Sequence, residues 1–412
     1  MDICDKIVDR IPSTIFFYSF LMIGPSTMLP NAFEKLQLSV GCYVQLAVKV
    51  KNNKVSEIVN EIYKKCIGCR TLFDGKNYVY TDQPCPTYQI PDKFPHLEEA
   101  NKFVAKNYTI PESTRLASIC YNKDTVIFNC NHSSSDGGYM KMLLDHVCGR
   151  ETPKDTQAKI HTSIIDALSD QLANANGKIS TMTTPIRNYR KKQEKEYAIY
   201  TLIEFPIKEK MSKVTEKMML AATLSASAYN KMLTSIASQL AVDARRYMKN
   251  PDWSHCNIDS LIVADAHTNI ATKYANLTID ELGALLRKDM QEKLKNGEAL
   301  RSINHLYKGT YPPAMTGSVS VTNIGKMTTG GDITDAQIAT SICKGPYPPG
   351  GMSISSTLVN DIFRARIYTS PYITSFKEAE KFKNAVNYCI KELKPDMTVK
   401  EAFTNLTKII HQ

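Results

Sequence analysis

The sequence has no apolar run long enough to cross a membrane. A spanning helix needs about 20 apolar residues, whereas the longest run here, Ile15 to Ile23, is far shorter. This run follows an acidic, mixed-charge start, and a secretory leader would begin with basic residues. We interpret the run as a buried strand, and because no targeting segment is evident we expect a cytoplasmic protein.

Several familiar catalytic signatures are also absent. The chain has no GxSxG, no HExxH and no protein-kinase set, which excludes the commonest hydrolases and phosphotransferases. The Gly- and Pro-rich stretch from Gly345 to Gly351 lacks the Lys-Ser/Thr ending of a phosphate-binding P-loop. We interpret it as a loop.

Cysteine is present, but not in a pattern that predicts disulfides or a metal site. The 11 cysteines are odd in number and scattered along a large chain, which favours reduced thiols used as small apolar residues. Cys66 and Cys69 form a CxxC, yet no second pair follows at a zinc-binding spacing. Asp265 and His267 lack a recognisable third ligand. We therefore expect no metal and no tightly bound cofactor.

The net charge of +10 suggests an anionic partner, but the basic residues are dispersed. Neither a helix-turn-helix nor a basic and aromatic platform is present, so nucleic acid is not expected. A small molecule bearing phosphate groups fits the charge as well. Lys208, Lys210, Lys213, Arg245 and Arg246 are candidates for contacting such phosphates, and a solvated charged face explains them equally well.

The length of 412 residues predicts two domains, because one hydrophobic core rarely grows so large. A polar, basic stretch near the middle predicts a linker. We place an N-terminal lobe at 1–180, the linker at 181–197 and a C-terminal lobe at 198–412. Both halves mix strands and helices, including a long helix expected over 225–248, and we expect a monomer.

The strongest signal is the run from Asn131 to Gly138, Asn-His-Ser-Ser-Ser-Asp-Gly-Gly. It follows a β-branched run, 123–130, that predicts a buried strand, and it precedes a predicted helix over 138–147. A histidine at such a strand end is held rigidly and titrates near neutral pH, so His132 is suited to removing a proton. Asp136 is expected to pin the loop. A core histidine beside a polar helix cap is the alternative interpretation.

These residues resemble the HxxxDG motif of the CoA-dependent acyltransferases, which include chloramphenicol acetyltransferase, fungal alcohol acetyltransferases, plant BAHD enzymes and peptide condensation domains. The strand Val319 to Gly325 resembles the S-N-x-G segment of the alcohol acetyltransferases, and Asp265-Ala-His267 is similar to a D-x-R element. Condensation domains usually have a second histidine where Asn131 stands. The DFGWG of plant enzymes is absent, since Trp253 is the only tryptophan.

The resemblance implies an α/β (α+β) protein of two chloramphenicol-acetyltransferase-like lobes, each a mixed sheet flanked by helices, with an active-site tunnel between them. His132 would then deprotonate a small alcohol or amine that attacks acyl-CoA, the cosubstrate. The amide of Gly137 with Thr322 or Asn323 would stabilise the oxyanion, strand-end hydrogen bonding being the alternative for the last two. His267 would be the partner of Asp136.

Two other functions remain open. One is transfer from a carrier-protein thioester, as in condensation domains. The other is a catalytically silent protein that keeps the fold and binds a ligand.

Overall fold

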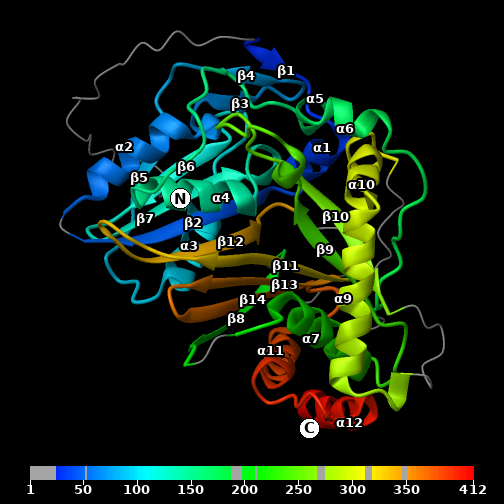
Figure 1. The fold of residues 1–412 in the computed structure, drawn as a ribbon. Helices are drawn as coiled ribbons and strands as arrows, with labels where there is room; N and C mark the ends of the chain where they lie inside the picture. Colours follow the sequence, from blue (N-terminus) through cyan, green and yellow to red (C-terminus); the bar gives the residue numbers. More distant parts are fainter. Residues whose placement is uncertain are drawn as a thin grey trace.

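The computed structural model describes two lobes built on two large mixed sheets (Figure 1). The described residues are 25–51, 53–186, 197–208, 211–266, 274–310, 318–345 and 351–412. The predicted strand at Ile15 to Ile23 lies outside these ranges. None of the helices within them is long and apolar enough to cross a membrane.

The first sheet contains the strand that leads to the HxxxDG motif. Its strands, in spatial order, are β12 (Ile333–Ile342), β2 (Cys42–Val50), β7 (Thr125–Asn131), β6 (Ala117–Tyr121) and β5 (Thr87–Gln89). Side chains alternate between the two faces of a strand. Val44, Leu46 and Val48 therefore pack toward α2 (Val55–Lys65) and α4 (Gly137–Val147), whereas Ala47 packs toward α3 (Leu97–Asn107).

The second sheet belongs mostly to the C-terminal half. Its order is β10 (Asp259–Asp265), β9 (Ala237–Asp243), β11 (Ser318–Met327), β13 (Gly351–Val359), β14 (Ile362–Thr369) and β8 (Ile199–Pro206). β11 runs parallel to both of its neighbours. The helices of this lobe are α7 (Val214–Tyr229), α9 (Ile279–Lys295), α10 (Glu298–Tyr307), α11 (Phe376–Lys391) and α12 (Val399–His411).

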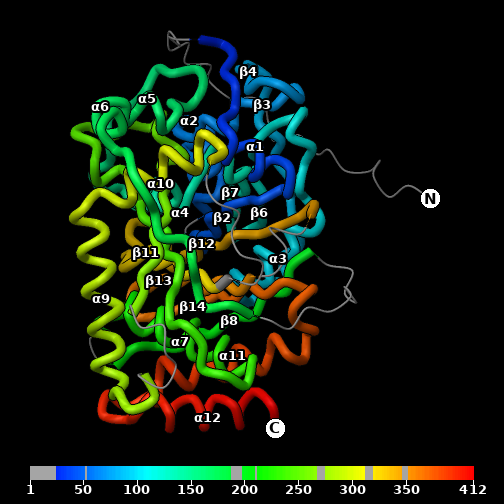
Figure 2. Tube along the Cα trace, turned by 90° about the vertical axis from the view of Figure 1, so that its right-hand side faces the viewer, coloured from blue at the N-terminus to red at the C-terminus, as the bar shows by residue number. Residues whose placement is uncertain are grey.

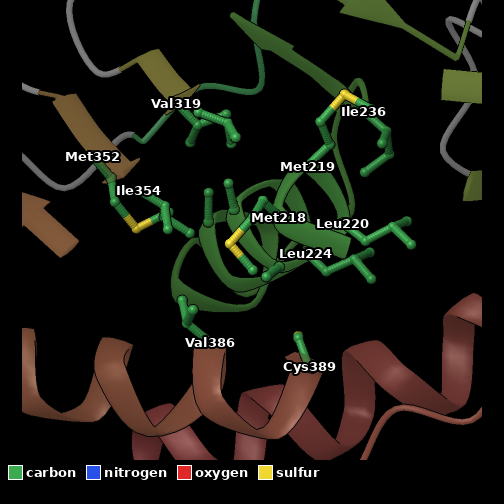
Figure 3. Packing of buried hydrophobic residues seen from close by; sticks show 14 of the residues in the cluster. Met218, Met219, Leu220, Leu224, Ile236, Val319, Met352, Ile354, Val386 and Cys389 are labelled. Atoms are coloured by element: carbon green, nitrogen blue, oxygen red, sulfur yellow. The ribbon is translucent and has the colours of Figure 1, made fainter. Parts of the chain in front are cut away.

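The core of the C-terminal lobe surrounds α7, which is buried on nearly every side. Met218 and Met219 pack with Val319 and Ile354 of the sheet, and Val386 of α11 lies across the helix from them (Figure 3). A helix that is apolar all round is stable only when it is enclosed in this way. α7 therefore joins the sheet to the outer helices α11 and α12.

The remaining elements are short. They are β1 (Thr27–Met28), β4 (Tyr78–Tyr80) and β3 (Thr71–Phe73), which form a small sheet, with α1 (Ala32–Ser39), α5 (Ile164–Ala167), α6 (Ser169–Ala173), η1 (Ile67–Arg70), η2 (His132–Ser134) and η3 (Ala244–Tyr247).

One strand crosses between the halves of the sequence. β12 comes from the C-terminal half, yet it pairs antiparallel with β2 at the edge of the first sheet, from Cys42 opposite Ile342 to Val50 opposite Ile333. Both views show this orange strand beside the blue β2, above the sheet of the C-terminal lobe (Figures 1 and 2). The first sheet is thus completed by residues that the sequence places in the second lobe.

The start of the predicted linker is packed rather than loose. Thr184 is buried, and its backbone amide donates to the Ala237 carbonyl at 2.8 Å. Ile186 is also buried, and residues 187–196 lie outside the described ranges. The boundaries 1–180, 181–197 and 198–412 stay a prediction.

The long helix expected over 225–248 is wrong. α7 ends at Tyr229, and β9 and η3 follow within the expected range. Along β9, Ser238, Leu240 and Val242 are buried and the residues between them are partly exposed, which is the period of a strand. The alanines around them concealed this alternation.

Candidate active site

His132 begins η2, immediately after the buried strand β7, as the sequence predicts. The Asn131 side chain accepts from the Ser133 amide at 3.0 Å and so caps this turn. Ser133, Ser134 and Ser135 are buried, whereas His132 is partly exposed. The residues that follow His132 in the loop are therefore enclosed, and His132 is the residue of this turn that solvent reaches.

The His132 ring is held by Gln37, a residue of α1 that the sequence did not indicate. Nε2 of Gln37 lies 3.0 Å from Nδ1 of His132. An amide nitrogen can only donate, so Nδ1 accepts and the neutral ring carries its proton on Nε2. Asn257 in turn donates to Oε1 of Gln37 at 3.2 Å, which fixes the amide in this orientation.

Asp136 pairs with Arg245 and also caps a helix. Oδ1 and Oδ2 accept from the two terminal nitrogens of the guanidinium at 3.0 and 2.9 Å. Oδ1 also caps α4 by accepting from the Tyr139 amide at 2.7 Å, and Oδ2 accepts from the Ile258 amide at 2.6 Å. This paired, bidentate geometry is the strongest form of an ion pair. The predicted partner, His267, lies outside the described residues.

Arg245 is buried, so it does not face solvent as a phosphate contact would. Burial opposes its charge, yet the carboxylates of Asp136 and Asp243 raise the pKa of the guanidinium above its usual value. Asp243-Ala244-Arg245 also has the D-x-R spacing, and its arginine is the residue that pairs with Asp136. The erroneous helix over 225–248 concealed it.

The two glycines of the motif lie against different neighbours, Gly138 against the ion-pair cluster and Gly137 against β11. A Cβ on Gly138 would lie 2.5 Å from an Asp243 carboxylate oxygen and 2.6 Å from an Arg245 nitrogen. A Cβ on Gly137 would lie 3.3 Å from the Ile324 side chain of β11. Gly137 is the first residue of α4, where backbone amides have no acceptor within the helix. Its amide is therefore available to an anion.

Thr322 and Asn323 lie on β11, where the strand is interrupted by a bulge. Asn323 Nδ2 donates to Thr215 at 2.9 Å, and its Oδ1 accepts from the Gly325 amide at 3.0 Å. Gly325 has a φ of +88°, which only glycine adopts readily. The Asn323 side chain therefore shapes the bulge, and Thr322 is the partly exposed residue beside it.

A cavity of about 440 Å³ is lined in part by Asp243, which also pairs with Arg245. Its walls are mainly apolar, and polar side chains lie among them. The apolar lining is Leu240, Ala241, Val242, Ile262, Met290, Leu294 and Val321, and the polar lining is Thr215, Asp243, Arg246 and Asn323. Asp243 thus belongs both to this cavity and to the ion-pair cluster that holds the HxxxDG loop.

A second carboxylate, Asp259 at the start of β10, lies near His132. The Tyr307 hydroxyl donates to its Oδ1 at 3.2 Å and lies 3.1 Å from its backbone carbonyl. Burial raises the pKa of Asp259 to about 6, and His132 is close enough to oppose that rise. Asp259 carries no signal in the sequence, because a lone acid at a strand end belongs to no motif.

The described residues contain no group of three His, Cys, Asp or Glu side chains arranged to hold a metal ion. Cys66 and Cys69 are buried free thiols, and burial raises the pKa of both. Their sulfur atoms therefore act as core atoms. Asp265, the other candidate ligand, has a backbone amide that donates to the Asp289 carboxylate at 2.7 Å.

No protein-family model and no curated protein sequence matches the chain. Solved structures do. A starter condensation domain of rhizomide synthetase, an arginine-to-alanine mutant in complex with C8-CoA, is similar with a TM-score of 0.60 and 12% identity, over 91% of this chain and 97% of that one. Polyketide synthase associated protein 5 from Mycobacterium tuberculosis is similar with a TM-score of 0.57 and 13% identity, over 95% of this chain and 100% of that one.

The structure of holo T3CT is similar as well, with a TM-score of 0.55 and 13% identity over 92% of this chain and 94% of that one. At these identities the likeness establishes the fold. The chain has the two-lobed, chloramphenicol-acetyltransferase-like fold of condensation domains, and the predicted mixed α/β architecture is confirmed.

Proposed function

We propose that the protein is an acyltransferase that moves an acyl group from acyl-CoA to the hydroxyl or amine of a small acceptor, with His132 as general base. The observation that carries this proposal is a partly exposed imidazole on a loop fixed by the buried Asp136–Arg245 pair. A thioester is already activated, so one positioned base suffices and no acyl-enzyme is required.

In this proposal His132 removes the proton of the acceptor as its oxygen or nitrogen attacks the thioester carbonyl. The developing oxyanion needs donors that are already in place. The Gly137 amide at the start of α4 fills that role, with Thr322 of β11 as its partner, because Ile324 places β11 against Gly137. The imidazolium then returns the proton to the departing thiolate.

The Gln37 amide determines which ring nitrogen of His132 is the base. With Nε2 of Gln37 on Nδ1, the outward nitrogen of His132 carries the proton and cannot accept another. A half-turn of the amide presents Oε1, moves the proton to Nδ1 and frees the outward nitrogen. Asn257 can follow, since its buried Oδ1 has no partner among the described residues and would then accept from Gln37.

We assign the acyl chain of the donor to the 440 Å³ cavity, because most of its lining residues are apolar and Asp243 connects it, through Arg245, to the loop of His132. Arg246, exposed at its rim, is the remaining member of the Arg245–Arg246 pair for a CoA phosphate. A carrier-protein thioester is the second candidate donor, favoured by the likeness to condensation domains.

The test is thiol release from a panel of acyl-CoAs with simple alcohols and amines. We expect turnover by the wild type and its loss in His132→Ala, while His96→Ala, an exposed histidine, serves as control. Release only from a phosphopantetheinylated carrier would favour the second donor. Equal activity of His132→Ala and wild type contradicts the mechanism. If both proteins are inactive but bind a ligand tightly, the protein is a catalytically silent member of the fold.

A further inference from the structure

Three carboxylates lie on or next to the elements that meet at the candidate base, and they differ in their partners. Asp136 has Arg245, and Glu34 has His161 at 3.3 Å with both side chains buried. Asp259 forms no ion pair with any of the residues that the structure describes, and among these residues its carboxylate has one hydrogen bond, from the Tyr307 hydroxyl. It is also the one of the three that is partly exposed.

Neighbouring contacts place Asp259 at the His132 side of the site. Two residues earlier in the chain, Asn257 contacts the Gln37 amide that holds the imidazole. The Tyr307 ring lies 5.5 Å from that of Phe33, one helical turn before Gln37 on the same face of α1. Tyr307, the hydrogen-bond partner of Asp259, and His132 therefore contact the same face of α1, one helical turn apart.

A carboxylate in such a position is costly unless a cation approaches it. Burial raises the pKa of Asp259 against the opposing effect of His132, and burial together with Asp259 raises the pKa of Tyr307, so the tyrosine keeps its proton and remains a donor. The Tyr307 hydroxyl orients the carboxylate without neutralising it. No lysine or arginine among the described residues forms an ion pair with this carboxylate, which leaves its charge open to a cation from outside the chain.

We propose that Asp259 binds the ammonium group of the acceptor, so that the acceptor class is a primary amine. This inference rests on the proposed acyl transfer. An alcohol loses one proton during transfer, and that proton leaves on the thiol, so a single base is enough. An ammonium ion loses two protons in forming an amide, and the site offers two acceptors, Asp259 and His132.

The step balances as follows. Asp259 takes one proton from the bound ammonium ion, and the neutral nitrogen attacks the thioester carbonyl to form the new C–N bond. His132 takes the second proton from that nitrogen. The C–S bond breaks, the thiolate takes the proton from His132, and the proton on Asp259 passes to solvent. The products are an amide, a thiol and one free proton.

The test compares n-hexylamine with n-hexanol, using an acyl-CoA that the wild type accepts. At neutral pH the amine is almost entirely ammonium, so the pair differs in charge at similar size. Asp259→Asn retains the shape and an acceptor for Tyr307 but removes the charge. We expect kcat/KM for the amine to fall by about 30-fold or more and for the alcohol by less than about threefold.

Asp396→Asn makes the same charge change on an exposed residue and is the matched control. Asp259→Ser is a second variant, with the same selective loss expected, in case Asn perturbs folding. An equal loss for both acceptors, or an amine rate that is unchanged, overturns the amine assignment and leaves acyl transfer intact. Wild-type protein that uses neither acceptor overturns the proposed function and this inference with it.

Discussion

Asp136 accepts from a guanidinium and two backbone amides, whereas the carboxylate of Asp259, the residue after Ile258, accepts from one tyrosine hydroxyl within the described part of the chain. The Ile258 amide binds the first carboxylate, so the two acids are almost adjacent in space. One is buried and saturated with donors, and the other is partly exposed with spare acceptor capacity. The difference separates an acid that fixes the loop from an acid that can meet a substrate.

The largest effect on stability is expected from removing the guanidinium partner of Asp136, the acid that is saturated with donors. Arg245→Ala leaves Asp136 buried without its cation, and we expect a loss of about 3–5 kcal/mol in the free energy of unfolding. Urea denaturation measures it. Arg246→Ala, the exposed neighbour in η3, is the matched control and should change stability by about 0.5 kcal/mol or less. Similar losses in both variants would mean that the Asp136–Arg245 pair adds no particular stability, and the contrast between Asp136 and Asp259 would then disappear.

Removing the charge of Asp259 should change stability in the opposite direction. The folded pKa of Asp259, about 6, exceeds the value of about 3.9 for an unfolded chain. The folded state therefore binds more protons between these values, and wild-type stability falls as pH rises through this window. The Asp259→Asn variant has no carboxyl group at this position, so this loss of stability does not occur in it.

We therefore expect Asp259→Asn to gain up to about 3 kcal/mol relative to wild type between pH 4 and pH 7.5, which corresponds to two pKa units. Denaturation curves at both pH values check it. A variant that is less stable than wild type at pH 7.5 would mean that the carboxylate has an internal cation, and Asp259 would then resemble Asp136.

The smallest effect concerns Gln37, which faces His132 as a neutral group. Gln37→Glu adds a carboxylate that can only accept, so it holds the proton on Nδ1 and favours the imidazolium. We expect the acid limb of the pH–rate profile to move upward by about one unit or less. Gln37→Leu should lower kcat with little change in KM. A profile that is the same in all three proteins would limit Gln37 to packing.

The sequence predicted the parts of this site that lie next to one another in the chain. His132, Asp136 and Gly137 fall between a recognisable buried strand and a helix, and the structure places them as expected. Arg245 could have been found, because Asp243-Ala244-Arg245 has the D-x-R spacing, but an alanine-rich strand was interpreted as a helix. Propensity is a weak guide where tertiary pairing decides.

Gln37 and Asp259 carried no such signal. Gln37 lies on an amphipathic helix, and Asp259 begins a strand far along the chain, so each looks like an ordinary polar residue at the edge of an element. Their role depends on the meeting of α1, η2 and β10, which sequence periodicity does not encode. Polar residues recruited from distant elements become visible only when the fold brings them together.

The position of β12 bears on how the protein is made. The strand that closes the first sheet, Ile333–Ile342, emerges from a ribosome long after β2, its partner at Cys42–Val50. Until then β2 has an open edge, and pairings between such distant segments form slowly. The HxxxDG loop also lacks the ion-pair partner of Asp136 until Arg245 has been synthesised. The nascent N-terminal half is thus an incomplete body that cannot assemble the site before most of the chain has been synthesised.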